Sequence, residues 1–397
     1  IHRAQLYDRA LSAEEVAASA GVPSEYVTEA AVIARLAPED AAKRRELAES
    51  LNQTQKKYTS EPRRLVYAVT PKQPDATHVM ARGDIRAAGE IVPAGGVASL
   101  VGLSADFNLS PDAPEAKRRL ALARWISSPQ NPLFARVIVN RLWHYHFGAG
   151  LVDTPNDFGF NGGRPTHPEL LDWLATTLVA RGYSLKQLHR EIVLSATYRQ
   201  SSAKNEAAVK LDAGNRWLWR KTPQRLEAEA VRDATLVVAG ELNRARGGPG
   251  FLDTHEILRS GSYSYEPADR VGPEYQRRSV YRAWIRGGRN GLLDVFDCPD
   301  PSTTSPKRAV TTTPLQALAL LNNSFVLRMA ERYAQRVERE AGSGADASAI
   351  VTRAYQLAFQ RDPTPNELAI GRRMVAEHGA AVLTRAILNS NEFLYVD

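Results

Sequence analysis

The sequence predicts a mainly α-helical protein, in which one large helical domain with a few short strands follows a small α/β remnant and a linker. Amphipathic patterns with helical spacing recur from Pro114 to the end of the chain, and helix-start signals precede several of them. No repeat of fixed period is visible, which argues against a solenoid. With 397 residues, 43% of them hydrophobic, the chain is long enough for two or three domains with real cores.

Composition excludes several classes of function. No run of eighteen apolar residues is present, so no transmembrane segment is predicted. The net charge of +7 is too small for the dense basic surface of a nucleic-acid-binding protein. A single cysteine, Cys298, excludes internal disulfides, multi-cysteine zinc sites and a c-type haem. We therefore expect no nucleic-acid partner and no cofactor in this chain.

The sequence pattern of the first 112 residues predicts parts of a separate domain. Residues 4–7 read as a strand, and Ser12 with Glu15 forms a capping box that predicts a short helix. A lone strand is not stable, so we expect its sheet partners upstream of residue 1. Further on, the sequence predicts a charged helix, a strand and an extended linker, at residues 38–57, 65–69 and 71–112. We assign residues 1–20 to a domain tail and residues 21–112 to the helix, strand and linker.

From residue 113 the pattern is helical. Residues 114–126 and 132–147 predict two amphipathic helices, the second closed by Gly148. Capping boxes are predicted at Thr166 with Glu169 and at Ser184 with Gln187. The later elements are helices at residues 222–239, from residue 313, and at 347–359, 364–377 and 380–390, with a strand at 279–285. Residues 113–397 are therefore predicted to form one helical domain.

Several motifs follow one another in this region. They lie at residues 131–137 (NPLFARV), 140–148 (NRLWHYHFG), 154–159 (TPNDFG), 166–172 (THPELLD), 194–202 (LSATYRQSS), 225–230 (RLEAEA), 311–318 (TTTPLQAL) and 388–397 (LNSNEFLYVD). Together they resemble the planctomycete-specific C-terminal domain of unknown function called PSD-one, over residues 113–397. Residues 7–16 (YDRALSAEEV) resemble the tail of a laminin-G or concanavalin-like domain, which would make residues 1–20 part of a lectin-like fold.

The resemblance implies an exported protein of the periplasm or cell surface. Relatives of this kind carry a planctomycete cytochrome-c domain, a second planctomycete-specific domain and, in some cases, a lectin-like domain. A cytochrome-c domain is thus an expected partner, and haem is expected only on a missing or partner domain. The resemblance implies no catalytic residues.

The first candidate site combines two histidines and an aspartate. His146, near the end of the helix at residues 132–147, could act as an acid, a base or a ligand, with Asp157 and His167 completing the site. The alternative is that the histidines near this helix end cap it, since the helix dipole favours a cation there.

The second candidate is Glu227 in the helix predicted from Pro223. Helical spacing places it beside Val231, Ala234 and Val238, so we expect it to be partly buried. A buried carboxylate must be paired or protonated, and carboxyl groups with raised pKa values mark catalytic acids. The alternative is a structural ion pair with a nearby arginine, such as Arg220 or Arg278.

The third candidate is a basic face. On the strand predicted at residues 279–285 and its flanks, Arg278, Arg282, Trp284 and Arg286 would share one side. Guanidinium groups beside an indole suit the sulfate, carboxylate or phosphate of an anionic polysaccharide. The alternative is a solvated edge whose charges prevent aggregation.

Two hypotheses for the function follow. The first is a non-catalytic helical module of a carbohydrate-associated, cytochrome-linked envelope protein, which binds or docks. The second is an oxidative or hydrolytic enzyme acting on a complex polysaccharide, either sulfated or unsulfated, with Glu227, Asp157, His146 and His167 as acid/base groups. An arrangement of these four side chains around one open cavity would favour the enzyme.

Overall fold

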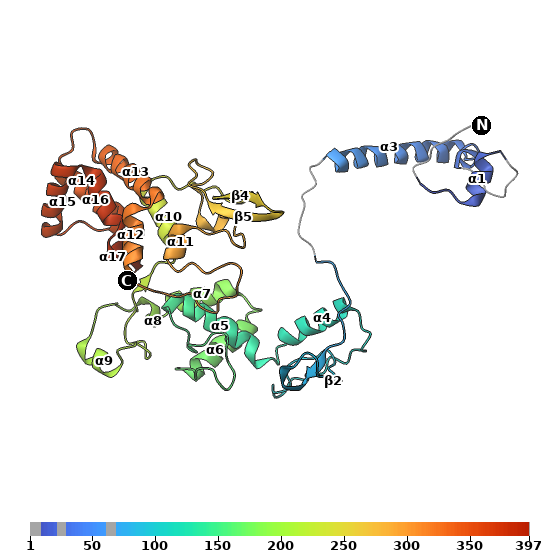
Figure 1. Ribbon diagram of the computed structural model, residues 1–397, viewed down its shortest axis with the longest axis horizontal. Coiled ribbons are helices and arrows are strands. Elements are labelled where there is room, and N and C mark those ends of the chain that lie inside the picture. Colours follow the sequence, from blue (N-terminus) through green and yellow to red (C-terminus); the bar gives the residue numbers. More distant parts are fainter. Residues whose placement is uncertain (1–8, 22–28, 61–68, 397) are drawn as a thin grey trace. The chain divides into compact units, whose positions relative to one another are not determined.

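The structure is a computed structural model that describes residues 9–21, 29–60 and 69–396. The chain divides into two compact units, Ile1–Asp75 and Ala76–Asp397 (Figure 1). The strand predicted at residues 4–7, and all but the last residue of the strand predicted at residues 65–69, lie outside the described residues.

The described part of the first unit contains three helices, α1 (Ala13–Ser19), α2 (Glu29–Ile33) and α3 (Pro38–Ser60). The capping box predicted for α1 is confirmed, because Glu15 N donates to Ser12 Oγ while the Glu15 carboxylate accepts from Ser12 N. The charged helix is also confirmed, since α3, every residue of which is described, buries no side chain.

The second unit begins with a small β-hairpin. Strands β1 (His78–Met80) and β2 (Ala88–Ile91) pair antiparallel around the 3₁₀ turn η1 (Ala81–Gly83), in a region predicted to be extended. The segment that follows folds over helix α4 (Glu115–Ile126), where Trp125 Nε1 donates to the Ser104 carbonyl at 2.9 Å. Gly96 lies against the same indole, so closely that a Cβ there would be 2.4 Å from the ring.

The first helical cluster holds five helices. They are α5 (Pro132–Phe147), α6 (Pro168–Ala180), α7 (Leu185–Leu194), α8 (Ala196–Arg199) and α9 (Glu206–Leu211). Val139, Trp143, Leu178 and Leu188 are among the side chains that form its core. The predicted cap of α5 is confirmed, because Gly148 has a φ of 80°.

Two capping boxes predicted in this cluster are wrong. Helix α6 begins one residue later than predicted, with His167 as N-cap and Pro168 in the first turn. Glu169 therefore stands one position too early to reach back to the N-cap. Ser184 is the N-cap of α7 as predicted, but its side chain makes no capping hydrogen bond.

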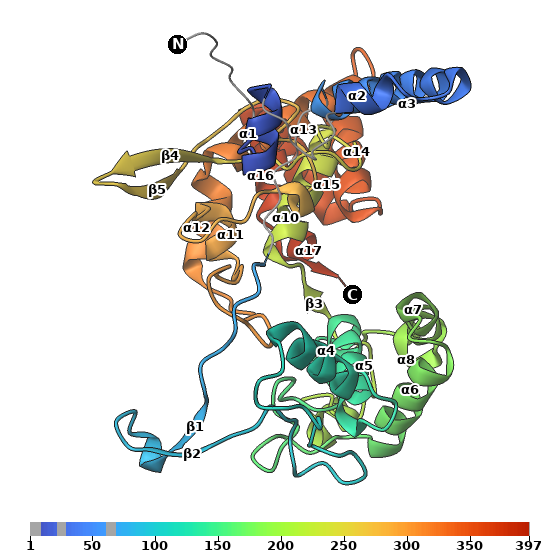
Figure 2. The ribbon, with the colours of Figure 1, turned by 90° about the vertical axis from the view of Figure 1, so that its right-hand side faces the viewer.

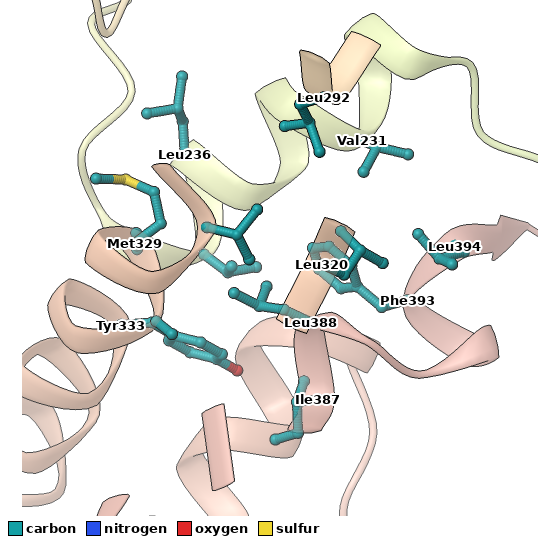
Figure 3. Packing of buried hydrophobic residues seen from close by; sticks show 14 of the residues in the cluster. Val231, Leu236, Leu292, Leu320, Met329, Tyr333, Ile387, Leu388, Phe393 and Leu394 are labelled. Atoms are coloured by element: carbon teal, nitrogen blue, oxygen red, sulfur yellow. The ribbon is translucent and has the colours of Figure 1, made fainter. Parts of the chain in front are cut away.

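The second helical cluster contains the larger core. Its helices are α10 (Ala228–Ala239), α11 (Gly291–Val295), α12 (Pro314–Asn322), α13 (Ser324–Ala341), α14 (Ala347–Phe359), α15 (Pro365–His378), α16 (Ala380–Leu388) and α17 (Asn391–Leu394). Figure 3 shows Leu236, Leu320, Tyr333 and Leu388 from four of these helices converging on one apolar interior. Full burial of each such side chain stabilises the fold by about 1.5–3 kcal/mol.

The helix predicted at residues 222–239 is partly wrong. Residues 224–225 form strand β3 (Gln224–Arg225), which pairs antiparallel with β6 (Tyr395–Val396), and α10 begins only at Ala228. Leu226 N also donates to the Leu394 carbonyl at 2.7 Å. Backbone pairing with a distant segment outweighs the local helix-start signal of Pro223 here. Figure 2 shows β3 between the two helical clusters.

The strand predicted at residues 279–285 is also wrong. Ser279–Tyr281 form the 3₁₀ turn η2, and the residues after it make a single parallel bridge, between Arg282 and Phe251. The regular strands of this region are β4 (Thr254–Arg259) and β5 (Ser262–Pro267), a hairpin that projects from the second cluster in both ribbon views (Figures 1 and 2).

The predicted fold class, mainly α with a few short strands, is confirmed: over the described ranges helices dominate, and the strands form two-stranded antiparallel pairs. None of the helices in those ranges combines the length and the apolar character that crossing a bilayer requires.

Candidate functional site

A cavity of about 670 Å³ lies between the two helical clusters of the second unit. The end of α5 forms one wall with Trp143, His144, Tyr145 and Phe147. The other walls come from residues 148–153, from the segment that carries β3 into α10, and from residues 296–297, 307–310 and Tyr395. Elements that are far apart in the sequence therefore line the same cavity.

The loop after α5 is held by one buried amide. Asn140, whose exposed fraction is 0%, donates from Nδ2 to the Val152 carbonyl at 2.9 Å and accepts from Val152 N at 2.8 Å. Gly150 lies so close to this amide that a Cβ would be 2.8 Å from its nitrogen and its oxygen. Because only glycine fits there, the loop can close over the end of α5 and shape the cavity wall.

The segment before β3 is tied to the same helix end. Lys221 Nζ and Gln224 Nε2 both donate to the His146 carbonyl, at 2.6 and 2.8 Å. The Lys221 ammonium also lies over the rings of Phe147 and Tyr198, at 4.9 and 4.1 Å from their centroids. Burial lowers the pKa of Lys221.

The floor of the cavity carries a charged cluster centred on Arg308. Its guanidinium donates to both carboxylate oxygens of Glu229, at 2.5 and 2.9 Å, and lies 3.4 Å from Glu227. Burial acts to raise the pKa of Glu229, but the hydrogen bonds from Arg308 offset it and the net pKa is lowered. Cys298 lies 3.8 Å from the same carboxylate, and burial with this neighbour raises the pKa of the thiol to about 12. It therefore stays protonated and unreactive near neutral pH.

A second ion pair fixes the opposite side. Arg225 donates to Asp297 at 2.6 Å, and both side chains are almost completely buried. Asp297 also accepts from Thr311 N and Oγ1, at 2.9 and 2.8 Å. Burial acts to raise the pKa of Asp297, but these hydrogen bonds hold it below its usual value. Both oxygens of Asp297 are therefore engaged within the protein, whereas Nε of Arg225 is buried without a hydrogen-bond partner among the described residues.

Glu227 faces the cavity, but its predicted burial is wrong. Its side chain is 49% exposed, and its nearest arginine is Arg308, in place of the Arg220 or Arg278 expected. The reason is that Glu227 precedes α10 with extended backbone, so the helical spacing that placed it among Val231 and Val238 does not apply.

The other three predicted acid/base residues lie elsewhere. His146 is not among the residues that line the cavity, and it shares a hydrogen bond with His189, Nε2 to Nδ1 at 2.7 Å. Asp157 is exposed in the next loop and accepts from Gly159 N at 2.9 Å. His167 Nδ1 is 2.9 Å from Thr166 Oγ1, and its ring meets Trp217 edge-on. Among the described lining residues, Glu227 is the one member of the predicted group of four.

The alternative that the histidines near the end of α5 are favoured as cations is not supported. Burial lowers the pKa of both His144 and His146, and the neighbouring charges of Lys307 and Lys221, respectively, lower it further. His144, which lines the cavity, is therefore neutral at pH 7.

The predicted basic face is not formed as a strand face. Arg282 is 4% exposed, and its Nε donates to both oxygens of Asp253, at 2.9 and 2.8 Å, while its guanidinium stacks over Trp284. Arg278 lies 3.6 Å from Asp233 and is exposed, as is Arg286. A ligand-binding role for Arg278, Trp284 and Arg286 stays a prediction, whereas Arg282 has a structural partner.

Sequence reasoning missed most of the cavity. Lys307, Arg308 and Tyr395 were not singled out, because the segment around residues 301–313 has no periodic pattern and Tyr395 follows the last helix. Tyr145 lay in the motif at residues 140–148 without an assigned role. The motifs quoted from the sequence were the one available signal of the cavity. Four of them contribute to it or lie beside it, at residues 140–148, 225–230, 311–318 and 388–397.

No group of three or more His, Cys, Asp or Glu side chains is arranged to hold a metal ion in the part of the chain that the structure describes.

The fold and the cavity define a mainly helical domain with space for a small ligand between two helical clusters. Residues 118–375 match the PSD1 family, described as a protein of unknown function (DUF1553), and the chain belongs to this family. No curated protein and no solved structure matches the chain.

Proposed function

We propose that the protein is a non-catalytic module that binds a carbohydrate in the cavity between its helical clusters. The main support for this proposal is that aromatic rings and polar groups line one cavity of about 670 Å³. This volume lies in the range of small-molecule sites, about 300–1,000 Å³. We also propose that the protein is exported and that a cytochrome-c domain is its partner, because the sequence resemblance implies both.

The aromatic component suits a sugar ring. Tyr145 is 64% exposed beside the cavity and Tyr395 is partly exposed, whereas Phe147 and Phe296 also line the cavity but are almost completely buried, at 4% and 2% exposed, so Tyr145 is the ring that offers a face for stacking. A pyranose has an apolar face that stacks on such rings and a rim of hydroxyl groups that needs hydrogen-bond partners.

Part of the polar component, Arg308 and Arg225, is held in place before any ligand arrives. Glu227, neutral His144 and Lys307 line the cavity as hydrogen-bonding groups. Arg308 is fixed by Glu229, and Arg225 is fixed by Asp297, so neither needs to be ordered on binding. Fixed groups of this kind reduce the entropy cost of binding.

An enzyme that acts on a polysaccharide is the second candidate. Glu227 and Asp153 are exposed carboxylates that face the cavity, and glycoside hydrolases use pairs of carboxylates. The scatter of His146, Asp157 and His167 favours binding over this alternative.

The test is a binding screen by calorimetry against neutral and sulfated oligosaccharides. Tyr145→Ala should weaken the best ligand about 3- to 10-fold, because a stacking surface is lost. Tyr263→Ala is the matched control, since Tyr263 is 62% exposed on the β4–β5 hairpin and should not affect binding.

Two outcomes would contradict the proposal. The first is that no saccharide of the panel binds, or that both tyrosine variants bind like the unchanged protein. The second is release of new reducing ends by the unchanged protein and not by Glu227→Gln, which would replace binding by hydrolysis as the function.

A further inference from the structure

An exposed tryptophan beside the cavity has no role in the proposed site. Trp217 is 67% exposed, although the residues on both sides of it in the sequence, Arg216 and Leu218, line the cavity. Its indole meets the ring of His167 edge-on, at 5.6 Å between centroids, and His167 directly follows Thr166, another lining residue. The indole therefore lies next to the cavity and is open to solvent.

The backbone that carries Trp217 is held by Asp212. Its carboxylate accepts from Arg216 N at 3.0 Å and from Trp217 N at 2.8 Å. The Asp212 carbonyl accepts from Trp219 Nε1 at 2.9 Å, so the second indole of this loop is used within the protein. Trp219 is half-buried, and its ring lies 5.0 Å from the Arg220 guanidinium. Of the two tryptophans in the loop, Trp217 is the one with an open ring.

A buried amide closes the same loop. Asn215, at 6% exposed, donates from Nδ2 to the Arg220 carbonyl and to Thr222 Oγ1, both at 2.8 Å, and accepts from Arg220 N at 3.2 Å. Gln200, at the end of α8, donates from Nε2 to the Leu218 carbonyl at 2.8 Å. These hydrogen bonds fix the backbone on both sides of the exposed indole, so binding to it requires little ordering of the loop.

The loop also contains backbone strain beside the indole. Leu218 has a φ of 56°, in the left-handed region that a bulky side chain rarely adopts. Its side chain packs against the core of the first cluster, whereas Trp217 stays outside that core. The loop therefore accepts strain and leaves its largest apolar side chain in solvent, and both features reduce stability. Strain of this kind gathers at ligand-binding sites, where the surrounding structure maintains it.

The chemistry of an open indole beside the cavity suits a sugar ring. A pyranose can stack its apolar face on the indole, while its hydroxyl groups need polar neighbours. The exposed Arg216 and the half-buried His167 are polar side chains next to Trp217. Because the cavity begins at the adjoining residues, one saccharide chain can reach both places.

We propose that Trp217 is an outer subsite on which a further sugar unit stacks, so that the ligand is an oligosaccharide that extends from the cavity across this indole. The inference rests on the proposed carbohydrate-binding function and adds the length of the ligand to it. A short saccharide contacts the cavity alone, whereas a longer one gains a second stacking contact. Affinity should therefore rise with chain length.

The test measures the binding of two series of saccharides by calorimetry. The first series is glucose and its β-1,4-linked oligomers of two to six units, and the second is fragments of chondroitin sulfate of two, four and six units. In at least one series we expect the six-unit saccharide to bind about tenfold more tightly than the shortest member.

Trp217→Ala should weaken binding of the six-unit saccharide about 3- to 10-fold and leave the shortest member unchanged, because the lost stacking surface lies outside the cavity. Trp217→Phe should give an intermediate affinity, since phenylalanine keeps a smaller ring. Trp173→Ala is the matched control, because Trp173 is 53% exposed on α6 and does not line the cavity. Tyr145→Ala should weaken both lengths.

Two results would overturn the inference and leave the carbohydrate site in place, provided that Tyr145→Ala still weakens binding. They are equal affinity of the unchanged protein for the shortest and the six-unit saccharides, and equal affinity of Trp217→Ala and Trp173→Ala for the six-unit saccharide. Weaker binding of the shortest member by Trp217→Ala would also overturn it, since the indole would then act on the cavity itself. The absence of binding in both series would contradict the carbohydrate proposal and this inference together.

Discussion

At the residue scale, Asn140 links the core helix α5 to the loop that forms one wall of the cavity. Its amide is completely buried and makes both hydrogen bonds with Val152, so the loop that follows α5 depends on one side chain. Removing the amide would leave the carbonyl and the N–H of Val152 without these partners in the interior.

Asn140→Ala should lower the free energy of unfolding by about 1–3 kcal/mol, because buried polar groups lose their hydrogen bonds. Urea denaturation followed by circular dichroism measures this. Asn156→Ala is the control, since Asn156 is exposed and accepts one hydrogen bond from Arg141, and its change should stay within about 0.5 kcal/mol. Equal stability of both variants would show that Asn140 does not hold the loop.

Single residues were predictable from the sequence only where local rules applied. Ser12 with Glu15, and Gly148, act at helix ends through neighbours within four residues. Glu227 was misplaced because it precedes α10 with extended backbone. Its partner Arg308 lies 81 positions further along the chain, and no local pattern reports such a contact.

At the element scale, Arg361 joins two helices. It donates to both oxygens of Glu367, in the first turn of α15, and to both oxygens of Glu392, in α17. The hydrogen bonds from Arg361 and the N-cap residue Thr364 lower the pKa of Glu367 from 4.5 to about 2. A lowered pKa means that this contribution to stability is present above pH 4.5 and is lost as the pH falls through about 2.

Glu367→Gln should therefore lower the melting temperature by about 2–4 °C at pH 6, and the difference should shrink toward zero near pH 2. Glutamine keeps one acceptor oxygen for the capping box, so the change reports the loss of the charge together with one of the two hydrogen bonds from Arg361. Thermal melts from pH 2 to pH 7 measure it, with Glu256→Gln on β4 as a control in an exposed hairpin. A difference that is the same at every pH would refute the assignment.

The predicted helices agree with the structure where apolar residues recur with helical spacing. The helices predicted at residues 132–147 and 347–359 have the predicted bounds, because each places an apolar stripe on one core. The predictions failed at residues 222–227 and 279–285, where short extended segments pair with residues far along the chain. Helix-start signals and β-branched residues there carry no information about the partner.

At the scale of the whole molecule, an exposed segment without regular secondary structure connects the two compact units along the chain. Residues 69–77 are exposed and contain no helix or strand. The apolar cores belong to the second unit, in the two clusters around Val139 and Leu388.

Brief trypsin digestion should cleave after Lys72 and leave a resistant fragment that begins at Gln73. This fragment should keep its helical circular dichroism and melt within about 2 °C of the intact chain, because the core residues are retained. Mass spectrometry identifies the cut. Digestion that proceeds to small peptides without a stable intermediate would contradict the division into units.

The domain-level prediction from sequence gave the helical class and the region that matches the PSD1 family. It did not give the division of that region into two clusters or the cavity between them. Both depend on which apolar faces meet, and amphipathic patterns do not specify their partners.

The pairing of β3 with β6 has a consequence for synthesis. The first cluster can pack as soon as residues 131–218 have left the ribosome, since its core is local in the sequence. The second cluster must wait for residues 395–396, which reach back across 170 positions to Gln224 and Arg225. During that interval the nascent chain exposes α10 without the helices that cover it, so we expect the risk of aggregation to be greatest between the synthesis of α10 and that of β6.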